Sequence, residues 1–250
     1  MNHNTPKISI VTVVYNGAQT IEATINSIIN QTYKNIEYII VDGDSNDGTQ
    51  DIIKSYESEI SKWISEPDKG IYDAMNKGID LSTGDYIWFM NSGDEIADLT
   101  VLEEIISANP GSDIYYGDTV MIDSDGTEIG NRRLAPPEHL TWKSFKKGML
   151  VSHQSFIAKI NIIESYNLSY RFSADFEWCL LAIKRAKHIT NTHRTLSKFL
   201  DGGITKQNII PGLKERFRIM SKYYGLIPTC YNHIFIGIKF FYFYTKNKRF

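Results

Sequence analysis

The sequence predicts an α/β fold in which a mostly parallel central sheet is flanked by helices. Over the first hundred residues, runs of β-branched residues alternate with segments whose apolar residues recur at helical spacing. The first of these runs, "ISIVTVV", is apolar throughout, as expected of a strand that is covered on both faces. Polar residues follow the strands at their carboxyl ends. This rhythm of strand and helix predicts parallel strands joined by right-handed crossovers.

The elements of the first part of the chain follow from these patterns. The expected strands are residues 8–14, 36–42, 63–65 and 85–90. One expected helix carries Ile21, Ile25, Ile28 and Ile29 on one face, and another is marked by Ile71, Met75 and Ile79. Asn16-Gly17 ends the first strand, because this pair is typical of turns.

The second half of the chain is less regular. Residues 112–133 predict a hairpin around Asp125-Gly126. The stretch "SADFEWCLLAIKRAK" predicts a helix over residues 173–187, with Ser173 as its N-cap. Its expected buried stripe is Phe176, Leu180 and Ile183. Residues 207–224 suggest one more helix.

We therefore expect one domain with a C-terminal extension. The domain covers residues 1–205, of which 6–120 form the regular first half and 121–205 the less regular second half. The helical extension covers residues 206–250. No internal repeat or low-complexity linker divides the chain.

Bulk composition excludes several classes of protein. The chain has 250 residues, ordinary hydrophobic and charged contents, and a formal net charge of −2, which gives no reason to expect nucleic-acid binding. Its 2 cysteines are too few for a disulfide framework and indicate a reducing compartment. We find neither a secretory signal nor an apolar run long enough to span a membrane, so a cytoplasmic location is expected.

Polar clusters stand at the carboxyl ends of the expected strands, where ligands of parallel sheets gather. These clusters are Tyr15-Asn16, Asp42 to Asp47, and Asn91 to Asp94. Each has a simpler explanation, because the same residue types make turns and helix caps, and Asp47 could merely open the next helix. The first strand lacks the glycine-rich loop of nucleoside triphosphatases and NAD enzymes, which argues against both classes.

Four stretches together resemble a known family. "ISIVTVVYNG", "QTYKNIEYIIVDGDSNDGT", "EPDKGIYDAMNKGI" and "GDYIWFMNSGDE" look like the nucleotide-binding half of family 2 glycosyltransferases, which have the GT-A fold. The similarity is closest to bacterial exopolysaccharide and lipopolysaccharide enzymes of the colanic-acid type. It is strong over residues 6–120 and extends more weakly, through "HQSF" and "SADFEW", to about residue 205.

The resemblance implies a donor site. Val13 and Tyr15 would pack around the nucleotide base, and Asp42 or Asp44 would bind the base and ribose. The segment Asp68, Asp73 and Asn76 would line the same site, although Asp73 could be an ordinary helix residue. The family's usual second aspartate is replaced here by Gly43, so the choice between Asp42 and Asp44 stays open.

The resemblance also implies a cation site in "NSGDE". In the family, carboxylates at this position bridge a divalent cation, Mn²⁺ or Mg²⁺, to the donor diphosphate, and such cations prefer oxygen ligands. Here the usual third acidic position is Gly93. We therefore expect Asp94 to be the metal ligand, with Asn91 and Ser92 beside it contacting the donor. The alternative is a plain turn.

A further set of residues would serve catalysis. Asp175 matches the family's general base, which accepts the proton of the attacking hydroxyl. Glu177 is the fallback, and a favourable charge at a helix N-terminus is the simpler explanation for Asp175. His153, followed by Gln154, is expected near the acceptor or the diphosphate, although a lone histidine is more often structural.

The C-terminal segment is unusually aromatic and apolar. Residues 234–244 precede the basic residues Lys246, Lys248 and Arg249. Such a segment fits the interface of a membrane, with the cations toward anionic headgroups. An equally good explanation is a terminal helix that packs on the domain. Residues 230–250 are thus a candidate for peripheral contact with the inner face of the cytoplasmic membrane.

These features together predict an inverting glycosyltransferase. It would move a sugar from a nucleotide-sugar, expected to be a UDP-sugar, to a hydroxyl of a glycan or lipid-linked glycan in surface polysaccharide, lipopolysaccharide or capsule synthesis. One alternative is a sugar-phosphate nucleotidyltransferase, and another is a non-catalytic homologue that binds nucleotide or carbohydrate. The sequence does not identify the sugar or the acceptor.

Overall fold

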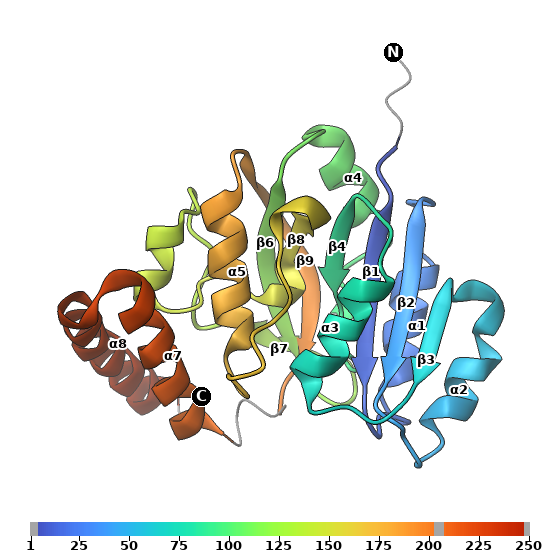
Figure 1. Cartoon of the computed structure of the whole chain (residues 1–250), viewed down its shortest axis with the longest axis horizontal. Helices are drawn as coiled ribbons and strands as arrows, with labels where there is room; N and C mark the ends of the chain where they lie inside the picture. The colour runs from blue at the N-terminus through green and yellow to red at the C-terminus, as the bar shows by residue number, and fades with distance from the viewer. Residues whose placement is uncertain (1–4, 203–207, 248–250) are drawn as a thin grey trace.

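A nine-stranded sheet runs through the centre of the protein, with helices on both of its faces (Figure 1). The computed structural model describes residues 5–202 and 208–247, and the backbone alone for residues 239–247. Eight strands follow the order β3-β2-β1-β4-β8-β6-β9-β5, and β7 pairs with β6.

The strands and helices have the following bounds. The strands are β1 (Ile8–Val14), β2 (Ile36–Asp42), β3 (Lys62–Ser65), β4 (Tyr86–Phe89), β5 (Glu95–Ile96), β6 (Ile114–Ile122), β7 (Glu128–Asn131), β8 (Phe156–Lys159) and β9 (Ile189–Leu200). The α-helices are α1 (Ile21–Ile29), α2 (Thr49–Ser55), α3 (Ile71–Leu81), α4 (Val101–Ala108), α5 (Ala174–Arg185), α7 (Ile209–Tyr224) and α8 (Leu226–Asn247). Short 3₁₀ turns are η1 (Glu57–Glu59), η2 (Trp142–Lys147), η3 (His153–Ser155) and η4 (Ile160–Ile162).

The first half of the sheet is parallel, as the sequence predicts. β1 pairs in parallel with β2 and β4, and β2 pairs in parallel with β3. The register places Val14 opposite Asp42, so the first two strands end side by side. The α/β class and the expected strands 8–14 and 36–42 are confirmed, as is the short strand at 63–65.

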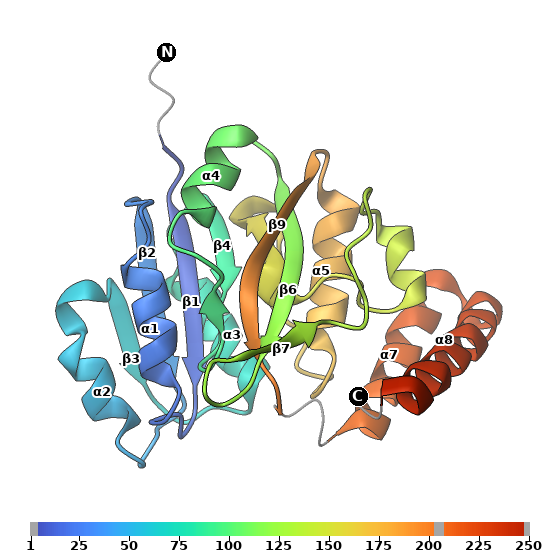
Figure 2. The ribbon, with the colours of Figure 1, turned by 180° about the vertical axis from the view of Figure 1, so that it is seen from behind.

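Two hydrophobic cores lie on opposite faces of this sheet. One core joins the sheet to α3, α5 and α7, and the other joins it to α1, α2 and α4. Figure 1 shows α3 and α5 in front of the strands, and Figure 2 shows α1 in front from the opposite side. Along β1, residues alternate between the two cores, which is why its seven residues are all buried.

The second half of the sheet mixes strand directions. β8 is antiparallel to β4 and β6, whereas β9 is parallel to β6. The predicted hairpin is confirmed as β6 and β7 around Gly126. Helix α5 is buried around most of its circumference rather than along one stripe. Ser173 is its N-cap, but the hydroxyl donates to the Gly212 carbonyl instead of accepting from the helix.

Helices α7 and α8 lie side by side beyond α5 (Figure 1, Figure 2). They pack on the core of the domain through Ile219, Met220 and Ile236. The predicted division at residue 205 falls within residues 203–207, which the structure does not describe, and the division stays a prediction. Lys248 and Arg249 also lie outside the described residues, and only the backbone of Lys246 is described.

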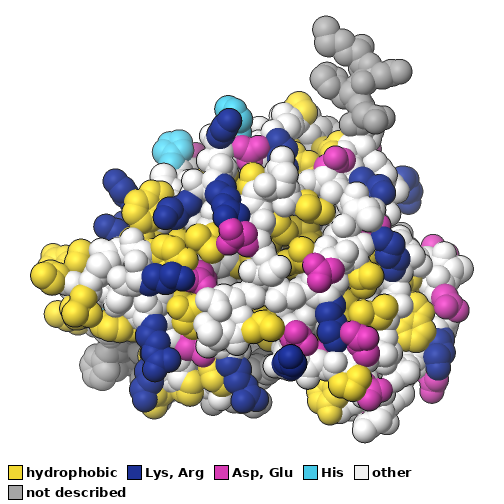
Figure 3. Space-filling view, in the orientation of Figure 1, with side chains coloured by type: hydrophobic (Ala, Val, Ile, Leu, Met, Phe, Trp, Pro, Cys, Tyr) yellow, Lys and Arg dark blue, Asp and Glu magenta, His cyan; other side chains and the backbone are white. Residues whose placement is uncertain are grey.

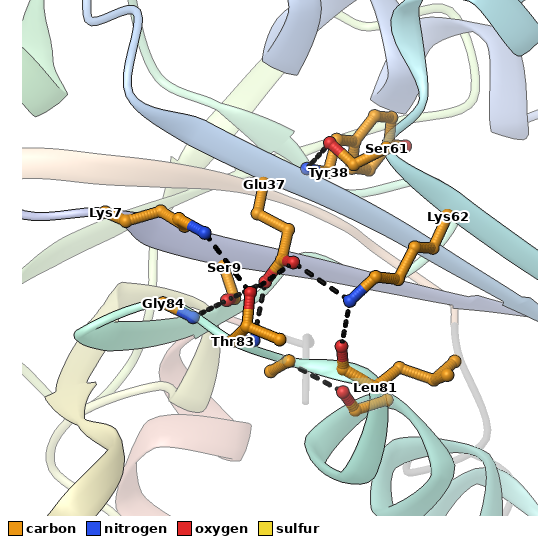
Figure 4. A network of polar contacts seen from close by, with 11 residues as sticks. Lys7, Ser9, Glu37, Tyr38, Ser61, Lys62, Leu81, Thr83 and Gly84 are labelled. Atoms are coloured by element: carbon orange, nitrogen blue, oxygen red, sulfur yellow. Dashed lines mark hydrogen bonds and ion pairs between the residues drawn. The ribbon is translucent and has the colours of Figure 1, made fainter.

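A buried carboxylate ties the strands together at their amino ends (Figure 4). Glu37 on β2 accepts hydrogen bonds from Ser9 on β1, from the backbone and hydroxyl of Thr83 before β4, and from Lys62 on β3. Burial raises the pKa of Glu37, but these donors outweigh burial and lower the pKa to about 2. One side chain thus joins the strands that support the polar loops at the far edge.

We predict that Glu37→Gln destabilises the protein at neutral pH. The folded-state pKa lies below the usual value of 4.5, so the carboxylate contributes stability above pH 4.5 that is lost as the pH falls toward 2. The shift of about 2.5 pKa units corresponds to at most about 3.5 kcal/mol, at about 1.4 kcal/mol per pKa unit. Urea unfolding between pH 3 and 7 measures this, with the exposed Glu103→Gln as control. Equal stability of the two variants at pH 7 would contradict the role of Glu37.

Candidate active site

A cleft of about 380 Å³ opens at the carboxyl edge of the sheet. Helix α3, the loop after β4, η3, the start of α5 and the end of β9 all contribute to its walls. Among the residues that line it are Tyr72, Asn91, Ser92, Asp94, His153, Gln154, Phe172, Asp175 and Asp201. The structure therefore brings together three separately predicted groups, the residues after β4, His153 and Asp175.

Asp175 enters this cleft from the first turn of α5. Its Oδ1 accepts a hydrogen bond from the Tyr72 hydroxyl at 3.0 Å, and its Oδ2 lies 3.5 Å from His153 Nδ1. Burial raises the pKa of Asp175, but His153, the charge of Arg216 and the Tyr72 hydroxyl together lower it below the usual value. The carboxylate is therefore ionised at neutral pH and held in one orientation.

His153 connects Asp175 to the loop after β4. Its other ring nitrogen, Nε2, lies 3.3 Å from Asn91 Nδ2. Asn91 Oδ1 is buried and has no hydrogen-bond partner among the described residues. An unpaired buried carbonyl oxygen is costly, so a donor or cation supplied by a ligand would satisfy it.

Asp94 is almost fully buried in the wall of the cleft. Gln154 Nε2 donates to its Oδ2 at 2.9 Å, and the Leu200 backbone donates to its Oδ1 at 3.2 Å. Burial raises the pKa of Asp94 to about 6, even though these donors and His153 oppose the shift. Burial thus favours the protonated form of Asp94. A bound cation would lower the pKa again and favour the ionised form.

The glycine that replaces the family's acidic residue has a structural reason. Gly93 has φ +96°, in the left-handed region, and a Cβ there would lie 2.7 Å from a methyl carbon of Leu200. An aspartate at this position would be strained by the backbone conformation, and the Leu200 side chain would have to shift to admit its Cβ. The turn therefore presents its carboxylate one residue later, at Asp94.

The residues present fit a divalent cation that is shared with a ligand. No cluster of three or more His, Cys, Asp or Glu side chains suited to a metal occurs among the described residues. One carboxylate, Asp94, and one unpaired amide oxygen, Asn91 Oδ1, are nevertheless available in the same cleft wall. Mg²⁺-type ions are commonly held by one or two carboxylates together with substrate phosphates.

Two aspartates of the acidic loop after β2 differ in burial. Asp42 is fully buried and accepts hydrogen bonds from the backbone and hydroxyl of Ser45 and from the Ser65 hydroxyl. It organises the loop in this structure, and its contact with a nucleotide stays a prediction. Asp44, by contrast, is exposed, with a φ of +66° that turns the chain sharply.

The same loop is tied to the loop after β1. Successive backbone amides of Asn16, Gly17 and Ala18 donate to Ser45 Oγ, Thr49 Oγ1 and Asp47 Oδ2. Asp47 also accepts from the Thr49 backbone at the start of α2. Asp47 therefore does more than open a helix, since it joins two of the predicted donor-binding loops.

Tyr15, Gly43 and Asp68 meet beside these loops. Tyr15 is 65% exposed, with its ring free to stack on a planar ligand. A Cβ at Gly43 would lie 2.5 Å from Asp68 Oδ2 and 3.4 Å from the Tyr15 ring. The Asp68 carboxylate thus lies where the side chain of the family's second aspartate would begin. With glycine at position 43, the carboxylate can stay there.

The other residues predicted to bind the donor differ in their burial and in their hydrogen-bond partners. The Val13 side chain is buried in the core, although its backbone carbonyl accepts from Ser92. Ser92 lines the cleft, and its hydroxyl contacts Thr20. Asp73 accepts from the Lys69 backbone. Asn76 pairs through both amide atoms with the backbone of Tyr166, which makes it a structural link between α3 and the chain before α5.

Glu177, the fallback for the general base, lies outside the cleft. Glu177 follows Asp175 by two residues, which places the two side chains on opposite sides of α5. Glu177 contacts Lys222, Tyr223 and Asn167 in a different hollow, away from the cleft. It holds α7 against α5 and is not positioned to accept a proton in the cleft.

Two residues that act on the Asp175 carboxylate escaped the sequence analysis. Tyr72 stands beside the predicted Asp73 in "GIYDAMN", where it looks like part of the apolar face of a helix. Arg216 lies on α7 in a segment without any motif, yet its charge acts on Asp175. Only the tertiary structure identifies these partners.

The geometry defines a class of protein: an α/β fold with a carboxylate-lined cleft at the carboxyl edge of its mostly parallel sheet. Comparison with known proteins agrees. Residues 9–174 match the family described as Glycosyl transferase family 2. An uncharacterized glycosyltransferase of Mycobacterium tuberculosis is 31% identical over 195 residues, which cover 74% of this chain and 72% of the relative.

Solved structures share the GT-A fold. S. aureus TarS 1–349, solved in complex with UDP-GlcNAc, superposes with a TM-score of 0.67 at 17% identity, over 86% of this chain and 64% of TarS 1–349. This chain thus spans less than two thirds of that protein. The mannosyltransferase PcManGT from Pyrobaculum calidifontis, in complex with GDP-Man and Mn²⁺, gives a TM-score of 0.64 at 13% identity, over 95% of this chain and 72% of PcManGT.

The chain belongs to glycosyl transferase family 2. It is a glycosyltransferase with the GT-A fold, as the four sequence stretches predict. Neither the nucleotidyltransferase nor the non-catalytic alternative is supported.

Proposed function

We propose that this glycosyltransferase inverts the anomeric centre of a UDP-sugar as it transfers the sugar to a hydroxyl of a glycan or lipid-linked glycan. Assembly of a surface polysaccharide is the process that fits this reaction. The observation that carries the proposal is the ionised Asp175 carboxylate, held by Tyr72 and His153 in the cleft that also contains Asn91 and Asp94.

Asp175 serves as the general base in this reaction. The acceptor hydroxyl loses its proton to the carboxylate while its oxygen bonds to the anomeric carbon. The bond between that carbon and the diphosphate oxygen breaks, so the electron pair leaves with the nucleotide. Because Tyr72 and His153 hold the carboxylate, it stays oriented toward the cleft throughout.

The donor is expected to lie across the ends of β1 and β2. The exposed Tyr15 ring offers a stacking surface for the base. Asp44 and Asp68 offer carboxylates to the ribose hydroxyls or the base. The UDP-GlcNAc complex of TarS, which shares the fold, supports a uridine nucleotide as donor.

A divalent cation would be held by Asp94 and Asn91. When bound, it would neutralise charge on the departing diphosphate. The Mn²⁺ complex of PcManGT is consistent with such an ion in this fold. Gln154 and the Leu200 backbone orient the Asp94 carboxylate, so its position does not depend on the ion.

Helix α8 provides the surface for peripheral membrane contact. Ile227, Tyr231, Ile234 and Ile238 recur at helical spacing and are all exposed. Figure 3 shows hydrophobic side chains gathered at the end of the molecule where α8 lies in Figure 1. None of the described helices is long and apolar enough to cross a membrane. An exposed apolar face of this kind fits a helix that lies in the membrane interface.

We predict that Asp175→Asn lowers kcat by about 10² or more while the affinity for UDP-sugar stays nearly unchanged, because only proton acceptance is lost. Glu177→Gln is the matched control, since both residues stand in the first turn of α5. If their charges merely favour the helix N-terminus, the two variants will behave alike. Steady-state kinetics with donor titration separates these outcomes.

We predict that Mn²⁺-dependent binding of UDP-sugar weakens as the pH falls through about 6. The raised pKa of Asp94 means that protons compete with the cation at this carboxylate below that pH. Higher Mn²⁺ should therefore shift the weakening to lower pH. Calorimetry with an intact UDP-sugar is suitable, because its diphosphate has no terminal ionisation near this pH. A binding profile that ignores Mn²⁺ concentration would remove Asp94 from the cation site.

We predict that replacing Ile227 and Ile234 together by Asp lowers binding to anionic liposomes by about tenfold or more, since each buried isoleucine contributes about 1.5–3 kcal/mol. Co-sedimentation at low salt measures this, and Leu99→Asp, an exposed leucine before α4, is the control. Equal liposome binding by both variants would show that the exposed face of α8 does not contact the membrane.

A further inference from the structure

The chain just before α5 forms part of the wall of the active-site cleft. Arg171 and Phe172 both line the cleft, and Asp175 follows in the first turn of the helix. Residues 171–173, here called the entry segment, belong to neither a helix nor a strand. Their position decides where α5 begins and therefore where the Asp175 carboxylate stands. Since no regular hydrogen-bond ladder holds the entry segment, contacts from another element must fix it.

Helix α7 supplies these contacts through Glu215. Its Oε1 accepts a hydrogen bond from the Arg171 backbone amide at 2.9 Å, and its Oε2 accepts one from the Phe172 amide at 2.8 Å. Hydrogen bonds to a carboxylate are stronger than those to a neutral acceptor. The Ser173 hydroxyl adds a third contact, 3.2 Å from the carbonyl oxygen of Gly212, one turn earlier on α7. All three residues of the entry segment are thus fixed to the same helix.

The next residue of α7 acts on the Asp175 carboxylate itself. Burial raises the pKa of Asp175, whereas His153, the charge of Arg216 and the Tyr72 hydroxyl lower it. Arg216 directly follows Glu215 in the chain. Adjacent residues of α7 therefore act on the wall of the cleft and on the carboxylate inside it. Helix α7, which the sequence assigns to a C-terminal extension, thus belongs to the surroundings of the active site.

The contacts that hold α7 on the domain are separate from Glu215. Ile219 and Met220 are buried in the core, and the Tyr223 hydroxyl donates to Glu177 at 2.8 Å. These residues lie in the last turns of α7. Loss of the Glu215 carboxylate should therefore free the entry segment while the helix stays docked.

We propose that Glu215 is a positioning residue of this glycosyltransferase, which acts through Arg171 and Phe172 to set the cleft wall beside Asp175. This inference rests on the proposed function, because it takes Asp175 as the base. The donor is proposed to lie across the ends of β1 and β2, whereas the entry segment is held by α7. Glu215 therefore affects the chemical step rather than the affinity for the donor. A misplacement of about 1 Å at a reacting group can lower the rate about a hundredfold.

Amide hydrogen exchange of the full chain, followed by NMR, tests the contact without any turnover. In Glu215→Ala the amides of residues 171–172 lose their acceptors, so we expect them to exchange at least about tenfold faster. The amides of residues 219–220 should keep their rates, because α7 stays docked. Lys214→Ala, an exposed neighbour on the same helix, is the matched control and should change neither pair. Equal acceleration of both pairs in Glu215→Ala would show that Glu215 merely docks α7, and unchanged rates at residues 171–172 would equally overturn the proposal.

Hydrolysis of a UDP-sugar measures the consequence for catalysis. UDP-glucose and UDP-N-acetylglucosamine are tried as donors, and the one that is hydrolysed faster is used. We expect Glu215→Ala to lower kcat about tenfold or more, with little change in the KM of the donor. Glu215→Gln should fall between, since its side chain offers one acceptor oxygen in place of two. The stoichiometry of UDP binding by calorimetry gives the fraction of folded protein, so kcat refers to that fraction alone. An unchanged kcat in Glu215→Ala would contradict the positioning role.

The pH dependence of kcat separates positioning from a purely structural role. The titratable and charged groups that face Asp175 are Tyr72 from α3, Arg132 after β7, His153 from η3, Tyr166 before α5, Cys179 from α5 and Arg216 from α7. When the entry segment shifts, Asp175 moves relative to His153 and Arg216 while it stays buried, so its pKa rises. The acidic limb of the kcat profile should therefore move to higher pH in Glu215→Ala, by about half a unit or more. A lower fraction of folded protein would scale the profile and leave the limb in place, and that result would remove Glu215 from the positioning of the base.

The exchange and kinetic results together separate this inference from the proposed function. If the intact protein hydrolyses neither donor but exchange at residues 171–172 quickens as expected, the proposed donor is wrong and the hold of Glu215 on the cleft wall is supported. If the intact protein hydrolyses a UDP-sugar and Glu215→Ala does so with the same kcat and the same acidic limb, the proposed function stands and the role of Glu215 is wrong.

Discussion

The parallel pairing of β1 with both β2 and β4 is the constraint on which the site depends. Because the three strands run in one direction, the loops after Val14, Asp42 and Phe89 emerge at one edge of the sheet. Hydrogen bonds then join the first two loops, so the surface proposed to bind the donor is already ordered without a ligand. Glu37 holds the opposite ends of the same strands together and thereby maintains their register.

The second half of the chain completes the site by packing against this edge. Antiparallel pairing of β8 with β4 carries His153 and Gln154 to the residues after β4. The end of β9 supplies the Leu200 amide to Asp94. Helix α5 begins at the same place, so Asp175 reaches His153 from the opposite wall. The proposed base and the candidate cation ligands thus come from segments that are far apart in sequence and are joined by short contacts.

Local patterns predicted the strands, the polar loops and the family, because strand periodicity and contiguous motifs are encoded in neighbouring residues. The two glycines that break the family pattern could not be explained this way. A Cβ at position 43 would meet the Asp68 carboxylate, and a Cβ at position 93 would meet the Leu200 side chain. Both neighbours are distant in sequence. The contacts of Glu177 with Lys222 and Tyr223 likewise depend on how α7 packs against α5. The effect of the Arg216 charge on Asp175 also depends on how α7 packs, which no motif records.

In the proposed reaction one carboxylate, Asp175, assists a direct displacement at the anomeric carbon. Such a displacement must invert the configuration of that carbon, because the acceptor oxygen enters opposite the departing diphosphate. Proton NMR of the first product formed from a UDP-sugar of α configuration distinguishes inversion from retention. We expect a β-linked product, and an α-linked product would rule out direct displacement.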